Sequence, residues 1–96
     1  MARFFAVFGC TSAEPMPELT VYTFADGCNV GVYYEEGGAT LTPEQMRLAA
    51  WLEFSVDDIE ATRQALAEIG VTPFEYFDKS HHYFAAPNGQ VFRLAT

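Results

Sequence analysis

Two adjacent histidines, His81 and His82, are the first residues of this 96-residue chain whose chemistry could serve a site. An imidazole can bind a metal or transfer a proton near neutral pH. The segment 80–85 around them is predicted to be a β-strand. Because neighbouring strand residues point to opposite faces, the two rings cannot chelate one ion together. We therefore expect at most one of them to face a site, and a structural or solvent-facing role rather than catalysis.

The cysteines and serines are weaker candidates for a catalytic site than the histidines. Cys10 and Cys28 have neither CxxC nor zinc spacing, and no base is identifiable beside either of them. Two free thiols of a cytosolic protein are the expectation. Ser12, Ser55 and Ser80 lie in no GxSxG context, so they do not indicate a serine hydrolase.

Composition narrows the classes of partner. The net charge is −8, from 13 acidic and 5 basic residues. This balance argues against nucleic acid and anionic membrane surfaces, because phosphate contacts need Lys and Arg, and it permits cationic ligands. No apolar run approaches the roughly 20 residues of a spanning helix, and the run 4–8 is shorter than the core of an export signal, about 7–15 residues. We expect a single cytoplasmic domain of residues 1–96.

The segment 51–70 gives the clearest structural prediction, a strand followed by a helix. Residues 51–56 alternate, which places Leu52, Phe54 and Val56 on a core face. Asp57 stands where a helix N-cap should be, with Glu60 three residues later, as in a capping box. The helix should bury a stripe at helical spacing, made of Ile59, Thr62, Leu66 and Ile69. Gly70 is expected to end it in a positive-φ conformation.

The remaining elements are predicted in chain order. Residues 2–8 could be a short helix or a strand, and residues 10–17 should be irregular or an edge segment. Strands are expected at 18–25 and 30–34 around an Asp26-Gly27 hairpin, with a break at the glycine pair 37–38. Thr42 should cap a short helix over 43–49. Further strands are expected at 71–77, 80–85 and 90–95, the last two joined by a turn at 87–89.

These elements form two unequal copies of one plan. Residues 51–96 give β-α-β-β-β, and residues 1–40 give the same unit without its opening strand, with a linker helix at 41–50. The fold class is therefore α+β, with paired βαβββ modules forming a curved mixed sheet. A sheet lacking a strand exposes unpaired backbone groups at one edge, and pairing with a second chain is the expected remedy. Two alternatives remain open: residues 3–8 supply that strand, or the chain is a fragment of a longer protein.

This pattern resembles a known family. The stretch WLEFSVDDIEATRQALAEIG, followed by HYFAAPNGQVFRLA, is similar to the second module of the vicinal oxygen chelate superfamily, which includes glyoxalase I, bleomycin-resistance proteins and extradiol dioxygenases. The run from Phe84 to Arg93 resembles the stretch aromatic-x-Asp-Pro-x-Gly-x-x-x-Glu that often ends the module. FFAVFG resembles the end of the first module's helix. The likeness covers residues 51–96 well and 2–35 loosely.

The resemblance also implies where a metal would be held. Metal-using members place ligands at the start of each module's first strand and near the end of its last strand. In this sequence those positions fall on Trp51 and Arg93 in the second module and near Gly31 in the first. An indole, a guanidinium and a glycine cannot ligate a divalent metal. We therefore expect no metal and no other cofactor.

If the sheet curves as in that family, its face opposite the helix lines a cup. Strand alternation then gives a mixed aromatic and charged wall. The ligand-binding candidates on it are Trp51, Glu53, Ser55, His81, Tyr83 and Arg93, with Val91 beside them. Trp51 and Tyr83 could stack on a planar or cationic ligand, and Glu53 could pair with a cation. Alternatively, Glu53 and Arg93 pair with each other.

The resemblance and the wall together predict a metal-free small-molecule-binding protein of the glyoxalase or bleomycin-resistance type, working as a homodimer and sequestering a cationic or aromatic compound. A metal-independent or weakly metal-dependent lyase or isomerase that uses His81, Tyr83 or Glu53 is the first alternative. The second is a protein-interaction subunit whose cup is filled.

Overall fold

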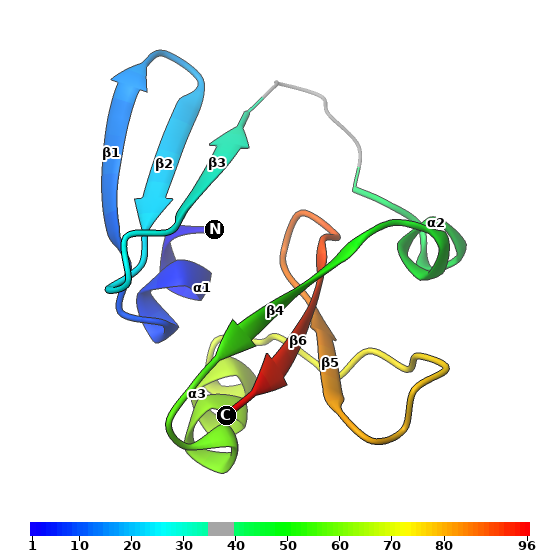
Figure 1. Ribbon diagram of the computed structural model, residues 1–96. Coiled ribbons are helices and arrows are strands. Elements are labelled where there is room, and N and C mark those ends of the chain that lie inside the picture. The colour runs from blue at the N-terminus through cyan, green and yellow to red at the C-terminus, as the bar shows by residue number, and fades with distance from the viewer. Residues whose placement is uncertain (35–39) are drawn as a thin grey trace. The chain divides into compact units, whose positions relative to one another are not determined.

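The computed structural model describes residues 1–34 and 40–96. The chain divides into two compact units, residues 2–39 and residues 40–96, and each is described by itself (Figure 1). The elements are α1 (Ala2–Val7), β1 (Thr11–Met16), β2 (Leu19–Thr23), β3 (Asn29–Tyr33), α2 (Pro43–Leu48), β4 (Trp51–Ser55), α3 (Ile59–Glu68), β5 (His82–Ala85) and β6 (Val91–Ala95). The predicted break at glycines 37–38 lies outside the described residues.

The first unit is a helix packed on an antiparallel sheet. Its strands lie in the order β1-β2-β3. Residues 2–8, for which helix and strand were both open, form α1, and its Phe4 and Phe5 are fully buried. The ring of Phe5 stacks on Tyr22 of β2, with centroids 4.2 Å apart. The chain between residues 10 and 17 is the edge strand β1, with every residue exposed.

The second unit is built on a mixed sheet of order β4-β6-β5. β4 runs parallel to β6, and β5 runs antiparallel to it. One face is a core of aromatic and aliphatic side chains: Phe54, Phe84, Phe92 and Leu94. Phe92 lies at the centre of this core, with ring centroids 4.5 Å from Phe54 and 5.8 Å from Phe84. Leu66, the buried residue of α3, lines one hollow together with Phe84, so α3 lies on this face of the sheet.

The predicted strand at 71–77 is wrong. The segment contributes one bridge, between Pro73 and Phe84, and runs on as a loop, drawn yellow to orange in Figure 1. Pro73 has no N–H to donate, and the one backbone hydrogen bond from this segment to β5 runs from the N–H of Phe74 to the carbonyl of Tyr83 at 2.9 Å. Tyr76 then turns to other partners, since its hydroxyl donates to the carbonyl of Arg47 at 3.0 Å. The second module is therefore β-α-(bridge)-β-β.

Two local predictions are also wrong. The N-cap of α3 is Asp58, whose carboxylate accepts from the N–H of Ala61 at 3.1 Å, and not Asp57. Either Asp could cap by type, and the packing of the helix selects the second. Glu60 instead pairs with Arg63 at 2.6 Å. Leu52 is not part of the core, because β4 is an edge strand of its sheet and leaves this side chain 42% exposed.

The turn and cap predictions are confirmed elsewhere. Thr42 and Gln45 form the capping box of α2, which begins with Pro43. Gly70 ends α3 with φ +85°, and Gly89 closes the turn before β6 with φ +90°.

Cys10 and Cys28 are free thiols. Within the described parts of the chain, no helix is long and apolar enough to cross a membrane.

Candidate functional site

Strand register brings three of the predicted site residues into one row. Glu53 of β4 and Tyr83 of β5 both pair with Arg93 of β6, so all three point to the sheet face opposite α3. Trp51 lies on the same face, two residues before Glu53. We call this set the sheet wall: Trp51, Glu53, Ser55, Tyr83, Val91 and Arg93.

Arg93 organises the sheet wall. Its guanidinium forms a salt bridge with Glu53, Nη2 to Oε1 at 2.6 Å, and a hydrogen bond from Nε to the same oxygen at 2.9 Å. It also lies over the indole of Trp51, with Cζ 4.1 Å from the ring centroid. The hydrogen bond to the hydroxyl of Tyr83 and then the charge and hydrogen bond of Glu53 raise the pKa of Arg93. Glu53 and Trp51 are thus already engaged by a cation of the protein.

The aromatic partners complete a continuous surface beside this cation. Trp51 meets Tyr83 edge to face at 6.0 Å, and Tyr83 stacks on Tyr76 at 4.9 Å. Tyr83 is buried, whereas Trp51 is 37% exposed. The sheet wall therefore offers a ligand a partly exposed indole beside a guanidinium, which suits a planar group. Tyr76 was missed at the sequence level because residues 71–77 were assigned to a strand.

Asp78 extends the network beyond the wall and was predicted only as a turn residue. Its Oδ1 accepts from the N–H and the hydroxyl of Ser80, at 2.8 and 2.5 Å, and its Oδ2 accepts from the hydroxyl of Tyr83 at 3.0 Å. Oδ2 also lies 3.7 Å from Nη1 of Arg93. The hydrogen bonds of Ser80, followed by those of His81 and Tyr83, hold the pKa of Asp78 far below its usual range. An Asp two residues before a Ser and three before a His was the available signal.

His81 joins the network through Asp78. Its Nδ1 lies 2.8 Å from Oδ2 of Asp78 and 2.9 Å from the hydroxyl of Ser80. Both contacts use the same ring nitrogen, so the three residues do not form a Ser-His-Asp relay, which needs one partner on each nitrogen. His82 is the first residue of β5, whereas His81 precedes the strand, so strand alternation does not separate the pair, and both line the hollow described below.

Ser55 stays apart from the cluster. It pairs in register with Ala95, and no described contact connects it with Arg93. The structure therefore assembles Trp51, Glu53, Tyr83 and Arg93 directly, and His81 through Asp78.

The donor set at this place does not fit a divalent metal. Trp51 and Arg93, the two positions to which the resemblance assigns ligands in the second module, are stacked on each other, and Arg93 brings a positive charge. Nowhere in residues 1–34 and 40–96 do three His, Cys, Asp or Glu side chains gather as a metal-holding group.

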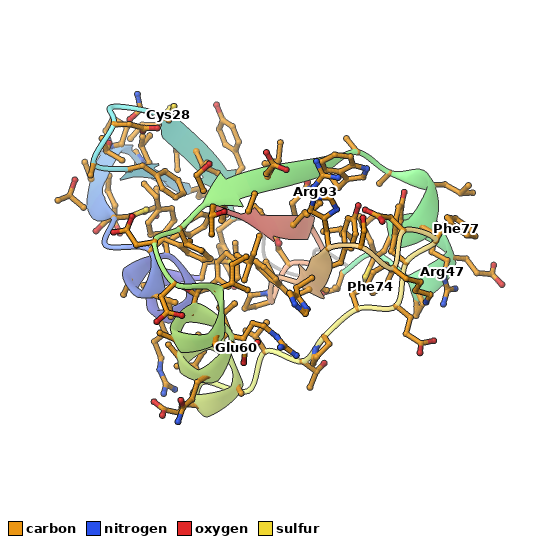
Figure 2. The ribbon with its side chains drawn as sticks, turned by 60° about the horizontal axis from the view of Figure 1, so that its bottom comes forward. Cys28, Arg47, Glu60, Phe74, Phe77 and Arg93 are labelled. Carbon is orange, nitrogen blue, oxygen red and sulfur yellow. The ribbon has the colours of Figure 1, made fainter. Side chains whose placement is uncertain are left out.

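A hollow adjoins the sheet wall at Tyr83 and extends along α3. It runs between α3 and residues 71–84 and has a volume of about 770 Å³. We call it the α3 groove. Leu66, Val71, Phe74 and Phe84 contribute its apolar lining, and charged side chains from α3 and from residues 75–82 surround them. Figure 2 shows Glu60 on α3 and Phe74 on the opposite segment.

No family model and no curated protein matches the sequence. Solved structures do match. A protein described as a possible glyoxalase from Bacillus cereus is 17% identical, with TM-score 0.69 over 99% of this chain and 84% of that one. The fosfomycin resistance protein FosX from Mesorhizobium loti is 16% identical, with TM-score 0.69 over 100% and 82%. A member of the glyoxalase/bleomycin resistance protein/dioxygenase superfamily from Sphaerobacter thermophilus is 17% identical, with TM-score 0.61 over 95% and 80%. The fold is therefore that of the vicinal oxygen chelate proteins.

Proposed function

We propose that this chain is a small-molecule-binding protein of the glyoxalase or bleomycin-resistance type, which binds a small aromatic compound on the sheet wall without a resident metal. The observation that carries the proposal is the stack of Arg93 on Trp51, because Trp51 stays 37% exposed although a cation lies over its ring. Two of the similar structures are described as a fosfomycin resistance protein and as a member of the glyoxalase/bleomycin resistance protein/dioxygenase superfamily, and sequestration of the bound compound is the role that we propose for this chain.

The wall favours an aromatic ligand over a simple cation. Glu53 is paired with Arg93 at 2.6 Å, so a ligand cation would have to displace a charged partner that is already in place. A planar ring needs no such exchange, because it can lie against the exposed part of Trp51 without displacing a charged group. Of the two ligand classes expected from the sequence, the aromatic one fits this geometry better.

The test is a binding series with one ring system and three charges: 2-naphthol, 2-naphthoate and 2-naphthylmethylamine. We expect the neutral or anionic compound to shift the NMR signals around Trp51 and Arg93 at a lower concentration than the amine does, a readout that is specific to the sheet wall. At a hundred times its dissociation constant, such a ligand adds about 2.7 kcal/mol and raises the unfolding midpoint by roughly 10 °C.

Trp51→Leu should abolish this binding. Phe77→Leu is the matched control, because it also removes an exposed aromatic side chain, 77% exposed, that is not part of the wall. Equal affinity of Trp51→Leu and the unaltered chain for every ligand that binds would overturn the proposal.

The proposal includes a symmetric homodimer. In the described part of the first sheet, β3 pairs only with β2 and its outer edge has no strand. A second copy is the simplest partner for such an edge.

A further inference from the structure

The α3 groove exists because residues 71–77 do not form a strand. After the single bridge at Pro73, the chain leaves the edge of β5, and a hollow remains between this segment and α3. All of its lining residues lie between Asp58 and Phe84, within the second unit. Its lining shares Tyr83 with the sheet wall and includes Asp78 and His81, but it contains neither Trp51, Glu53 nor Arg93.

The size and lining of the groove suit a small organic ligand. Its volume of about 770 Å³ falls in the range of ligand pockets, roughly 300–1,000 Å³. Leu66, Val71 and Phe84 are buried side chains that give it an apolar floor, and Phe74 adds a half-buried ring. A ligand body made of hydrocarbon or an aromatic ring would be desolvated there.

The charges around the groove select the class of ligand. Its lining carries four carboxylates and two basic side chains: Asp58, Glu60, Glu75, Asp78, Arg63 and Lys79. Arg63 and Glu60 form an ion pair at 2.6 Å, which leaves Lys79 as the one unpaired basic side chain of the described lining beside three carboxylates. Glu75 is exposed, and among the described contacts none pairs it with a cation. The excess of negative charge favours a cationic ligand over an anionic one.

His81 supplies an oriented acceptor at the same place. Its Nδ1 is held by the carboxylate of Asp78 at 2.8 Å, which assigns the proton of the neutral ring to Nδ1. Nε2 is then the acceptor, and His81 lines the groove. An ammonium N–H is a fitting donor for an imidazole nitrogen whose tautomer is fixed in this way.

We propose that the α3 groove is a second binding site, which takes an organic amine with an apolar body and holds its ammonium between Nε2 of His81 and the carboxylate of Glu75. This site meets the aromatic site on the sheet wall at Tyr83 but takes a ligand of different charge, so each is tested at residues outside the other: Glu75 and His81 for the groove, and Trp51 for the wall.

The experiment is an NMR titration of the isotope-labelled chain with 2-phenylethylamine, alongside 2-phenylethanol and phenylacetate, which keep the aromatic ring and change the charge. We expect saturable shifts with the amine in α3 and in residues 73–84. The alcohol and the acid should bind at least about tenfold more weakly, as expected for loss of a charge-assisted contact.

Two variants and one control locate the ammonium. Glu75→Gln and His81→Ala should each raise the dissociation constant of the amine about fivefold. Glu44→Gln removes the same charge from an exposed position on α2 outside the groove and should leave affinity unchanged. Both groove positions are exposed, so we expect the variants to fold, which circular dichroism checks.

Four results would overturn the proposal: equal binding of the alcohol or the acid, equal effects of Glu75→Gln and Glu44→Gln, shifts centred on Trp51 and Arg93, and no saturable shift at millimolar amine. None of them bears on the Trp51→Leu test of the sheet wall, because that test uses a naphthalene ring and changes a residue outside the groove.

Discussion

The last strands of the two units, β3 and β6, occupy different places in their sheets. β6 lies between β4 and β5, whereas β3 is an edge strand with β2 as its neighbour. Val91, Phe92 and Leu94 of β6 are each 1% exposed, but the residues of β3 alternate between exposed and half-buried. The two segments have similar β-forming compositions, so their burial follows from position in the sheet rather than from strand propensity.

The difference comes from the parallel opening strand. β4 pairs with β6 along its whole length, from Trp51 with Val91 to Ser55 with Ala95. Residues 2–34, the described part of the first unit, contain no such strand, and the core lies instead between α1 and β2, where Phe5 meets Tyr22. A βαβββ unit therefore keeps its helix and hairpin without its first strand, but its last strand becomes an edge.

The backbone of β3 shows how that edge can be tested. The N–H of Phe24 donates to the carbonyl of Cys28, and the N–H of Tyr34 donates to the carbonyl of Glu18, so even-numbered residues point their backbone groups towards β2. The N–H groups of Gly31 and Tyr33 then point to the outer edge. A proline at position 33 removes an outward donor without removing a bond to β2.

The largest expected effect is on oligomeric state. Tyr33→Pro should convert the proposed dimer into a monomer, because it blocks strand pairing at the outer edge. Tyr33→Thr is the control, since it removes the same exposed ring and keeps the N–H. Light scattering coupled to size exclusion measures both, and a dimer that survives Tyr33→Pro would show that the edge of β3 is not its interface.

Replacing a valine with alanine should lower the free energy of unfolding more in the central strand β6 than in the edge strand β3. Val91→Ala in β6 removes two fully buried methyl groups and should lower the free energy of unfolding by about 2 kcal/mol. Val32→Ala in β3 changes a half-buried side chain and should cost less than about 1 kcal/mol. Urea unfolding of both variants measures the difference. Equal losses would mean that β3 is covered in solution.

The smallest expected effect concerns two loop carboxylates. Asp26 in the first unit accepts a hydrogen bond from the N–H of Cys28, two residues later, at 2.9 Å. Asp78 in the second unit accepts the equivalent bond from the N–H of Ser80 and, in addition, bonds from the side chains of Ser80, His81 and Tyr83. Hydrogen bonding lowers the pKa of both carboxyls, chiefly from Cys28 for Asp26 and from Ser80 for Asp78.

A carboxyl whose pKa is lower in the folded than in the unfolded chain stabilises the fold at pH values above its ordinary pKa, and this stabilisation is lost as the pH falls below that value. Asp78→Asn should therefore lower the unfolding midpoint at neutral pH, and its gap from the unaltered chain should narrow below about pH 5. Asp26→Asn should show the same trend with a smaller gap. A gap for Asp78→Asn that widens on acidification would contradict the assignment.

Much of the fold could be predicted from local patterns. The strand at 51–56, the helix ending at Gly70, the Thr42 cap and the turn closed by Gly89 follow from alternation, capping chemistry and positive φ, which act over a few residues. Local patterns could not show that residues 71–77 do not form a strand. Tyr76 in this segment bonds to Arg47 and stacks on Tyr83, and these contacts join residues that are remote in sequence.

The candidate site was predicted in part. Alternation placed Trp51, Glu53, Tyr83 and Arg93 on one face, and the register of three strands brought them into contact. Asp78 was missed because its role comes from four hydrogen-bond donors that converge only when the loop folds back on β5.

The sequence by itself determined the unit plan, the faces of the strands and the chemical character of the wall, because side-chain period and caps are properties of neighbouring residues. Only the tertiary structure decided that Arg93 engages Glu53 and Trp51, that residues 71–77 leave the sheet, and that a groove opens beside α3. These outcomes depend on competition among partners far apart in the chain, and packing rather than local propensity resolves that competition.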